Sequence, residues 1–384
     1  MSEEQRAPLS LRIGLHPSIP SLLPSSCFSK HVRRRCLPGG LNKRTQVVLL
    51  VALIASIYIL TFPPYRPHSR LPSSPADKSA SSLSTKQPSY AYVTLLASNP
   101  KLDDKDVPDD EDEYFVGTRV LAYQLLHAPN TGTNSSIDFV VLATSDISES
   151  KLDRLRKDGV TVKVVEKIQE KWMKPGLLRW RDMLSKLHMW QLVEYQKTLF
   201  LDADMLIAKR MDGIFTDPTA APRKTNSSAA VADEAPIPSS YIFTAQTYIE
   251  GRVHKYPIPP GGFFSGGFFL AQPSIEAFNY YRHLASMEGR FDSNGMEQHM
   301  LNYAHRKDGP MPWAEVNYLY TTTWPSLKEY EAGAHSMHEK WWDQSLQLDN
   351  KLRAMWYQAR DDMKAFHAAR DGAGSREKSK DTLA

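Results

Sequence analysis

Residues 199–207, LFLDADMLI, constrain the fold of this chain more than any other stretch. Three apolar residues lead into two aspartates, Asp202 and Asp204, and apolar residues resume directly after them. A run of this kind is typical of a buried strand. Because burying a carboxylate without a partner costs roughly several kcal/mol, we expect the two acids to lie at the strand end and to hold a cation.

The segments before this strand alternate between strand and helix patterns. Strands are predicted at 90–98, 138–145 and 160–168 from their β-branched and aromatic residues. Residues 182–196 have the spacing of a helix. This order predicts an α/β fold with a mostly parallel central sheet flanked by helices. In such sheets ligands bind beyond the carboxyl ends of the strands, where the two aspartates come.

The spacing of the two aspartates suits a metal. Two carboxylates one residue apart can converge on one divalent cation, and oxygen ligands suit Mg²⁺ or Mn²⁺. Such a cation most often neutralises the phosphates of a nucleotide. Two alternatives stay open from these residues alone. One is a pair of solvated acids at a strand-to-loop junction. The other is a phosphatase with an aspartyl nucleophile, although those enzymes place this strand first and usually have Thr or Val where Met205 stands.

The longer block LSKLHMWQLVEYQKTLFLDADMLIAKRMDGIF, residues 184–215, is more specific than the aspartate pair. It resembles the core of the glycogenin-like glycosyltransferases of family 8, and the resemblance covers roughly residues 90–345. Those enzymes have the GT-A fold of nucleotide-diphospho-sugar transferases and use UDP-sugar donors with retention of configuration. The resemblance implies a Mn²⁺-dependent enzyme of this type.

Two glycine-rich and polar stretches extend the resemblance to the sugar pocket. FFSGGFFLAQPS and FDSNGMEQHMLN are similar to family patterns, which implies that Glu297, Gln298 and Lys186 surround the sugar as catalytic residues. An amide oxygen is a poor nucleophile, so we expect front-face attack through an oxocarbenium-like state. Ser265 stands where the family has an asparagine, and Gln246 or Thr247 where it has an acid, which puts glucose specificity in doubt.

The resemblance also implies the donor and metal sites. The residues expected to bind the nucleotide sugar are Leu95, Tyr114, Lys186, Asp202, Ala203, Asp204, Ser265, Gly266, Gly267 and Lys340. The metal ligands are Asp202, Asp204 and a histidine of AHSMHEKWWD; we favour His338 over His335 because it adjoins EKWW. Lys340 would neutralise the departing diphosphate. Trp180 and Arg181 are expected to pack or to form a surface pair.

The N-terminal region predicts a membrane anchor. Residues 46–62, QVVLLVALIASIYILTF, contain no charged residue over 17 positions, close to the roughly 20 that a spanning helix needs. Residues 1–45 carry eight Lys/Arg and two Glu, so the basic flank predicts a cytosolic N-terminus. The whole chain has a net charge of +4 and residues 1–45 contribute +6, so residues 46–384 carry about −2. This charge argues against nucleic-acid binding by the main domain.

The expected domain order follows from these segments. It comprises a disordered basic cytosolic tail at 1–45, a signal anchor at 46–62, a Pro/Ser-rich stem at 63–89, a GT-A domain at 90–345 with a surface insertion at 217–240, and a C-terminal helix and disordered tail at 346–384. This order predicts a single-pass type II protein of the Golgi or ER membrane with a lumenal catalytic domain. Asn134 and Asn226, in N-x-S sequons, lie on the lumenal side.

The expected activity is transfer of a sugar from a UDP-sugar to a glycan or glycoprotein acceptor. The HEKWW segment and the long insertions resemble a fungal, membrane-bound branch associated with α-N-acetylglucosamine transfer, so GlcNAc and glucose are both candidate sugars. Two alternatives are a self-glucosylating primer like glycogenin and a catalytically inactive, membrane-tethered scaffold. The acceptor, the linkage and the oligomeric state, a homodimer included, stay open.

Overall fold

A computed structural model describes residues 89–98 and 108–381. These residues belong to the second of two units into which the chain divides, Leu83–Ala384, and the first unit, Met1–Ser82, lies outside the described residues. The predicted tail at 1–45, the anchor at 46–62 and the stem up to residue 88 therefore also lie outside them. Within the described ranges, no helix has the length and hydropathy that a membrane span requires.

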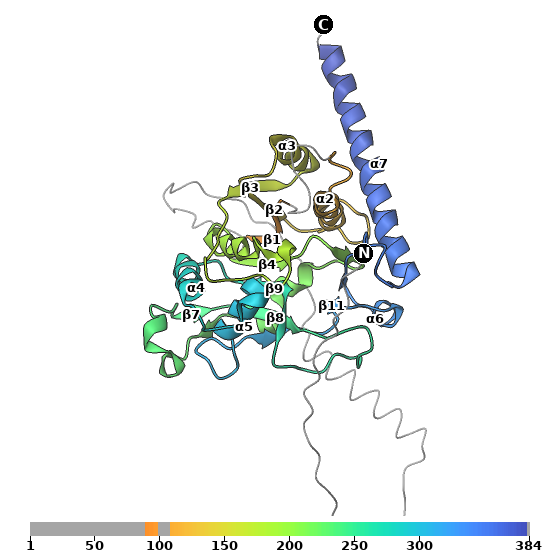
Figure 1. The fold of residues 1–384 in the computed structure, drawn as a ribbon. Coiled ribbons are helices and arrows are strands. Elements are labelled where there is room, and N and C mark those ends of the chain that lie inside the picture. The colour runs from red at the N-terminus through yellow and green to blue at the C-terminus, as the bar shows by residue number, and fades with distance from the viewer. Residues whose placement is uncertain (1–88, 99–107, 382–384) are drawn as a thin grey trace, which may run out of the picture. The chain divides into compact units, whose positions relative to one another are not determined.

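A seven-stranded sheet forms the centre of this unit (Figure 1). Its order is β10 (Ala314–Glu315), β8 (Phe243–Thr247), β9 (Phe264–Ala271), β4 (Lys197–Leu201), β1 (Tyr90–Leu96), β2 (Ile137–Thr144) and β3 (Thr161–Val165). All neighbours pair in parallel except β9, which is antiparallel to both β4 and β8. The predicted α/β fold with a mostly parallel sheet is confirmed.

Helices cover both faces of the sheet. Because successive side chains of a strand point to opposite faces, each strand contributes to a hydrophobic cluster on either side. Ala91, Val93 and Leu95 of β1 join one hydrophobic cluster, whereas Tyr92 and Leu96 join another. The first cluster includes side chains of α4 (Ile275–Ser286) and α5 (Met296–Ala304). The second includes side chains of α2 (Glu113–Leu126) and α3 (Glu149–Asp158).

The helix predicted at 182–196 is a shorter 3₁₀ helix, η2 (Met183–Gln191). Its buried residues Leu184, Leu187 and Trp190 recur every three positions. In a 3₁₀ helix residues three apart eclipse one another, so this spacing places all three side chains on one face. The tighter helix also buries Lys186.

A small second sheet has the order β11 (Thr322–Thr323), β12 (Ser336–His338) and β5 (Met205–Ile207). β12 is parallel to β11 and antiparallel to β5. The short helix α6 (Leu327–Glu331) lies between β11 and β12 in the chain and begins with a capping box at Ser326 and Glu329. This sheet joins segments near residues 322–338 to β5, the strand that follows Asp204.

The predicted surface insertion at 217–240 is ordered and partly anchored in the structure. It contains three short 3₁₀ turns, and its strands β6 (Arg223–Lys224) and β7 (Ser240–Tyr241) pair antiparallel. Glu234 is fully buried and accepts a hydrogen bond from the Tyr303 hydroxyl at 2.5 Å. The insertion is therefore fastened to the domain through this carboxylate.

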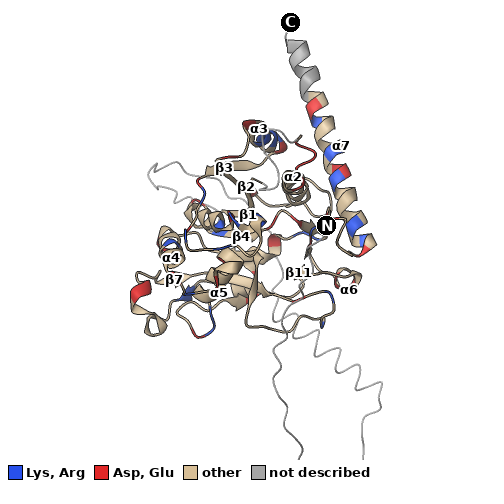
Figure 2. Ribbon diagram, in the orientation of Figure 1, with Lys and Arg blue, Asp and Glu red and all other residues tan. Residues whose placement is uncertain are grey.

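The C-terminal helix α7 (Asn350–Asp381) takes up most of the segment 346–384, for which a helix followed by a disordered tail is predicted. Leu352, Trp356, Met363 and His367 are buried and share one face of the helix. Beyond that face, Arg154 of α3 forms an ion pair with Asp371 at 2.6 Å. Acidic and basic residues alternate along this helix (Figure 2), which favours helix formation past the last apolar side chain.

Candidate active site

The aspartate pair lies at the carboxyl end of β4, as predicted. Asp202 directly follows the strand, and its N–H donates to the carbonyl oxygen of Gly267 on the antiparallel neighbour β9 at 2.9 Å. Asp204 then precedes β5. Asp204 is 5% exposed, so its carboxylate is removed from bulk water. The turn between the two strands places both acids at the same edge of the sheet.

The pairing of β5 with β12 brings His338 to this edge. The register sets His338 opposite Met205, the residue after Asp204. The Nε2 atom of His338 lies 2.9 Å from Oδ1 of Asp204 and 3.7 Å from Oδ2 of Asp202. Ligand atoms of these three residues all lie within 4.8 Å of one another.

These three residues fit a divalent cation. Two carboxylate oxygens and one imidazole nitrogen form a donor set that divalent metals accept. The opposing residue on β9 is Gly267, and a Cβ atom there would lie 2.7 Å from Oδ2 of Asp202 and against the His338 ring. The space between the donors is therefore kept free by the absence of a side chain. His335 is directed elsewhere: its Nδ1 lies 3.0 Å from the carbonyl oxygen of Arg210.

Lys340 compensates the charge of Asp204. Its Nζ donates to Oδ2 of Asp204 at 2.8 Å. Burial raises the pKa of Asp204, but Lys340 and His338 outweigh that effect and hold this pKa well below its usual range. Burial lowers the pKa of His338, whereas the Asp204 carboxylate raises it, and the net shift is upward. Asp204 is thus a carboxylate over the whole physiological range.

Lys186 pairs with Asp202 as Lys340 pairs with Asp204. Its Nζ lies 3.0 Å from Oδ1 of Asp202 and 2.7 Å from Oε1 of Glu297, and donates to the carbonyl oxygen of Gly266 at 3.1 Å. Burial lowers the pKa of Lys186, but the two carboxylates raise this pKa by more, so the net shift is upward. Burial raises the pKa of Glu297, and Lys186 offsets this only in part. The lysine therefore stays charged between two acids.

The first turn of α5 carries Glu297 and Gln298. Oε1 of Gln298 accepts the N–H of Gly266 at 2.7 Å. Ser265 lies on β9 beside them, and its hydroxyl accepts the N–H of Gly267 at 3.3 Å. This contact between α5 and β9 assembles the four predicted residues Ser265, Gly266, Glu297 and Gln298.

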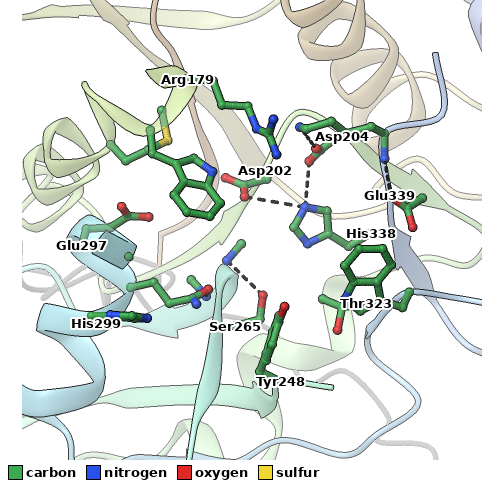
Figure 3. A pocket seen from close by; sticks show the side chains of 18 of the residues that line it. Arg179, Asp202, Asp204, Tyr248, Ser265, Glu297, His299, Thr323, His338 and Glu339 are labelled. Atoms are coloured by element: carbon green, nitrogen blue, oxygen red, sulfur yellow. Dashed lines mark hydrogen bonds and ion pairs between the residues drawn. The ribbon is translucent and has the colours of Figure 1, made fainter. Parts of the chain in front are cut away.

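A cavity of about 780 Å³ connects these groups. Of the predicted residues it is lined by Lys186, Asp202, Asp204, Ser265, Gly266, Gly267, Glu297, Gln298, His338 and Lys340. In Figure 3 Asp202, Asp204 and His338 lie together, Glu297 lies to the left of them, and Ser265 and Tyr248 lie below them in the view. Its volume falls within the range of sites that hold small-molecule ligands.

Three predicted residues lie outside the lining of this cavity. Leu95 is 8% exposed near the carboxyl end of β1, and Ala203 is 7% exposed between the two aspartates. Tyr114 packs edge-on against Trp342, with ring centroids 5.4 Å apart. The Lys340 ammonium lies 4.9 Å from the centroid of the Tyr114 ring. The roles of these residues in binding a base remain predictions.

Several lining residues were not predicted as site residues. Trp180, expected to pack, lines the cavity, while Arg181 forms the expected surface pair with Asp182 at 3.2 Å. Arg179, Tyr248, Phe263, His299 and Trp324 also line it. Gln246 and Thr247, by contrast, bond to Glu315 at 3.0 and 2.8 Å. The sequence offers only the apolar residues Leu177 and Leu178 beside Arg179 and Trp180 as a signal, and the structure shows Leu178 to be exposed.

Replacing Gly267 by alanine tests whether the space between the donors holds a metal. The added methyl group would lie against His338 and 2.7 Å from Oδ2 of Asp202, so we expect Gly267→Ala to lower Mn²⁺ affinity by at least about tenfold. Gly262→Ala is the matched control, because a Cβ there meets nothing within 4 Å. Electron paramagnetic resonance of free Mn²⁺ measures both affinities. Equal binding by the two variants would contradict the assignment.

Replacing each histidine in turn tests the third ligand. Because only His338 lies within reach of both aspartates, His338→Ala should weaken Mn²⁺ binding by about tenfold or more, as loss of a ligand does. His335→Ala should leave it close to wild type. Titration calorimetry with Mn²⁺ gives both values. A larger loss in the His335 variant would reverse the assignment.

Comparison with known proteins finds glycosyltransferases among relatives of low sequence identity. No protein-family profile matches the chain. An uncharacterized protein of Schizosaccharomyces pombe is 28% identical over 309 residues, which cover 72% of this chain and 80% of that protein. UDP-glucuronate:xylan alpha-glucuronosyltransferase 2 of Arabidopsis thaliana is 23% identical over 285 residues, or 70% of this chain and 43% of the relative.

Glycogenin-1 of Homo sapiens is 29% identical over 200 residues, which cover 50% of this chain and 45% of glycogenin-1. This chain thus matches less than half the length of each of these two named glycosyltransferases. Among solved structures, the glycosyltransferase GlyE of Streptococcus pneumoniae has a TM-score of 0.44 at 12% identity, covering 75% of this chain and 64% of that one. The described residues form the predicted α/β fold with a mostly parallel central sheet, and the chain is similar in sequence to glycosyltransferases.

Proposed function

We propose that this chain is a retaining glycosyltransferase that moves a sugar from a UDP-sugar to a glycan or glycoprotein acceptor, with Mn²⁺ as cofactor. The observation that carries the proposal is the convergence of Asp202, Asp204 and His338 within 4.8 Å of one another. Lys186 and Lys340 flank them within hydrogen-bonding distance of the two aspartates. This arrangement of acids and cations suits a metal-bound diphosphate. The similarity to named glycosyltransferases supports it.

In the proposed reaction each charged residue has a separate task. Asp202, Asp204 and His338 would hold the cation, which would neutralise charge on the diphosphate as the bond to the sugar breaks. Lys340 lies 2.8 Å from Asp204 and therefore next to the expected metal. From this position its ammonium would stabilise the leaving UDP. Arg179, a further cation on the cavity lining, faces the same space. Electrostatic stabilisation of the leaving group is therefore the main catalytic effect.

The sugar itself would lie among Lys186, Glu297 and Gln298. The Gln298 amide oxygen already accepts the Gly266 N–H, which makes it a still weaker nucleophile. This contact supports front-face attack through an oxocarbenium-like state. Glu297, held by Lys186 at 2.7 Å, supplies negative charge beside such a cationic state. Tyr114 and Leu95 would position the uracil base, and the sugar would be GlcNAc or glucose.

UDP release tests the activity. We would use the full-length chain in detergent with Mn²⁺ and a panel of UDP-sugars without acceptor. Wild type should release UDP slowly from one donor, and Asp204→Asn should lower that rate by about a hundredfold, because it removes charge at the metal. Asp308→Asn is the matched control, since the Asp308 side chain is 89% exposed.

The outcomes of that assay separate the alternatives. Release that depends on Asp204 but not on Asp308 supports the enzyme and identifies the donor. Binding of Mn²⁺ and UDP without release of UDP points to an acceptor-dependent enzyme. Absence of both binding and release would contradict the proposal and favour the inactive scaffold. Sugar incorporated into the chain itself from labelled donor alone would favour the primer, which the similarity to glycogenin-1 makes the second candidate.

The proposed location is the lumen of the Golgi or ER, reached through the anchor at 46–62. Asn134 and Asn226 are both exposed in the folded domain, so the oligosaccharide-transferring machinery of the lumen has access to them. Peptide N-glycosidase F should therefore increase the gel mobility of the chain isolated from its native cells. The double variant Asn134→Gln, Asn226→Gln should show no such shift. An unglycosylated wild type whose folded domain is digested by protease in intact vesicles, before permeabilisation, would contradict the lumenal topology.

A further inference from the structure

One wall of the cavity has no role in the proposed donor chemistry. This wall is formed by aromatic side chains from three separate segments. We call it the aromatic wall and define it by Tyr248, Phe263, His299 and Trp324, all of which line the cavity. Tyr248 lies across the cavity from Asp202 and Asp204 (Figure 3). The aromatic wall therefore faces the region where the sugar and the diphosphate would meet.

Strand register fixes Trp324 relative to the metal ligands. In the small sheet Thr323 pairs with His338, and His338 pairs with Met205. Trp324 directly follows Thr323, just as Asp204 directly precedes Met205. The backbone of Trp324 has a φ of 51°, a left-handed conformation that is a rare outlier for a bulky residue. Such outliers persist where the surroundings impose them and cluster at functional sites.

Arg252 holds the Trp324 ring in place and connects it to the metal site. Its guanidinium lies 5.3 Å from the centroid of the Trp324 ring. The same guanidinium pairs with Glu339 at 2.8 Å, and the N–H of Glu339 donates to the carbonyl oxygen of Asp204 at 3.3 Å. A cation, an acid and a backbone bond therefore join the indole to the second aspartate.

The opposite part of the aromatic wall is fixed by the loop between β8 and β9. The N–H of Tyr248 donates to the carbonyl oxygen of Phe263 at 2.9 Å, which closes the base of the loop. The Tyr248 and Phe263 rings meet edge to face with centroids 6.1 Å apart, and Phe263 meets His299 in the same way at 5.4 Å. These rings form a continuous row that ends next to Gln298 of α5.

The charges on the aromatic wall indicate what it binds. Arg252, the cation that lies behind the Trp324 ring, is already paired with Glu339. Glu250, which also lines the cavity, is exposed. The lysine and arginine side chains that line the cavity near the expected diphosphate, Lys340 and Arg179, belong to other segments, and Lys340 is paired with Asp204. Flat aromatic faces with polar groups at their edges suit a neutral pyranose ring, which has apolar C–H faces and equatorial hydroxyls.

We propose that Trp324 and Tyr248 form the acceptor subsite and stack on a neutral pyranose of the acceptor glycan. This inference rests on the proposed function, because it assumes a sugar donor at the metal. It places the attacking hydroxyl between the aromatic wall and Gln298. Trp324 is then a binding residue for the acceptor, and Arg252 is the positioning residue that acts through Trp324.

Direct glycan binding tests this subsite separately from the donor chemistry. The full-length chain, in a zwitterionic detergent without sugar groups, would be loaded with Mn²⁺ and UDP and applied to arrayed neutral oligosaccharides and their sulfated and sialylated counterparts. Wild type should bind at least one neutral glycan. Trp324→Gly should weaken that binding by at least about tenfold, as loss of a central aromatic contact does. Glycine accepts the left-handed backbone, so this variant removes the ring without adding strain.

Three further variants test whether the aromatic rings themselves bind the glycan. Trp324→Phe keeps an aromatic face and should retain most of the binding, and Tyr248→Ala should weaken it like Trp324→Gly. Val253→Ala is the control on the same loop, because Val253 is fully exposed, and it should bind like wild type. Thermal unfolding of each variant checks that the fold is retained.

Three outcomes would overturn the subsite. They are binding of acidic glycans alone, equal binding by Trp324→Gly and wild type, and no glycan bound by a wild type that binds UDP and Mn²⁺. A wild type that binds neither UDP nor Mn²⁺ would instead reject the proposed function, and the subsite with it. The donor-side measurement therefore distinguishes the two failures.

Discussion

The antiparallel pairing of β5 with β12 determines where the charged groups of the cavity lie. It joins a strand from the middle of the domain to one more than a hundred residues later in the chain. His338 faces Asp204 only because the register sets it opposite Met205. A slip of one residue would turn the imidazole to the other face of the small sheet. Lys340 and Trp324 depend on the same register, since they flank β12 and β11.

The buried charges next to this sheet are almost balanced before any ligand binds. Asp202, Asp204 and Glu297 contribute three carboxylates, and Lys186 and Lys340 contribute two ammonium groups, all within paired distance. A buried carboxylate keeps its charge only with such partners. A divalent cation and a diphosphate carry opposite charges of similar size, so together they would enter without upsetting this balance. Because three carboxylates face two ammonium groups, the cation reverses the sign of the remaining charge, whereas a diphosphate without the cation would add to the negative charge.

Much of the fold and part of the site could be predicted from the sequence. Strand and helix periodicity gave the α/β class, and the apolar lead-in to Asp202 placed the aspartates at a strand end. His338 was harder, because two histidines lie three residues apart and only the pairing with β5 distinguishes them. The 3₁₀ geometry of η2 and the anchoring of the insertion by Glu234 depend on tertiary packing, which overrides local preference. Tyr248, Phe263 and Trp324 carry no local signal, because their proximity arises only in the folded chain.

Backbone strain marks the places where the sequence is least informative. Within the described residues, Met296 and Trp324 are the non-glycine residues with positive φ, at 47° and 51°. Met296 directly precedes Glu297, and its side chain is buried in the core. The sharp turn there starts α5 with Glu297 and Gln298 directed at Lys186 and Gly266. Trp324 makes the equivalent turn on the other side of the cavity. A non-glycine residue held in such a sparsely populated backbone conformation costs roughly 1–3 kcal/mol, and here the core holds Met296 and Arg252 holds Trp324. Both strained turns project side chains into the same cavity, which is the distribution expected where binding geometry, and not local stability, determines the backbone.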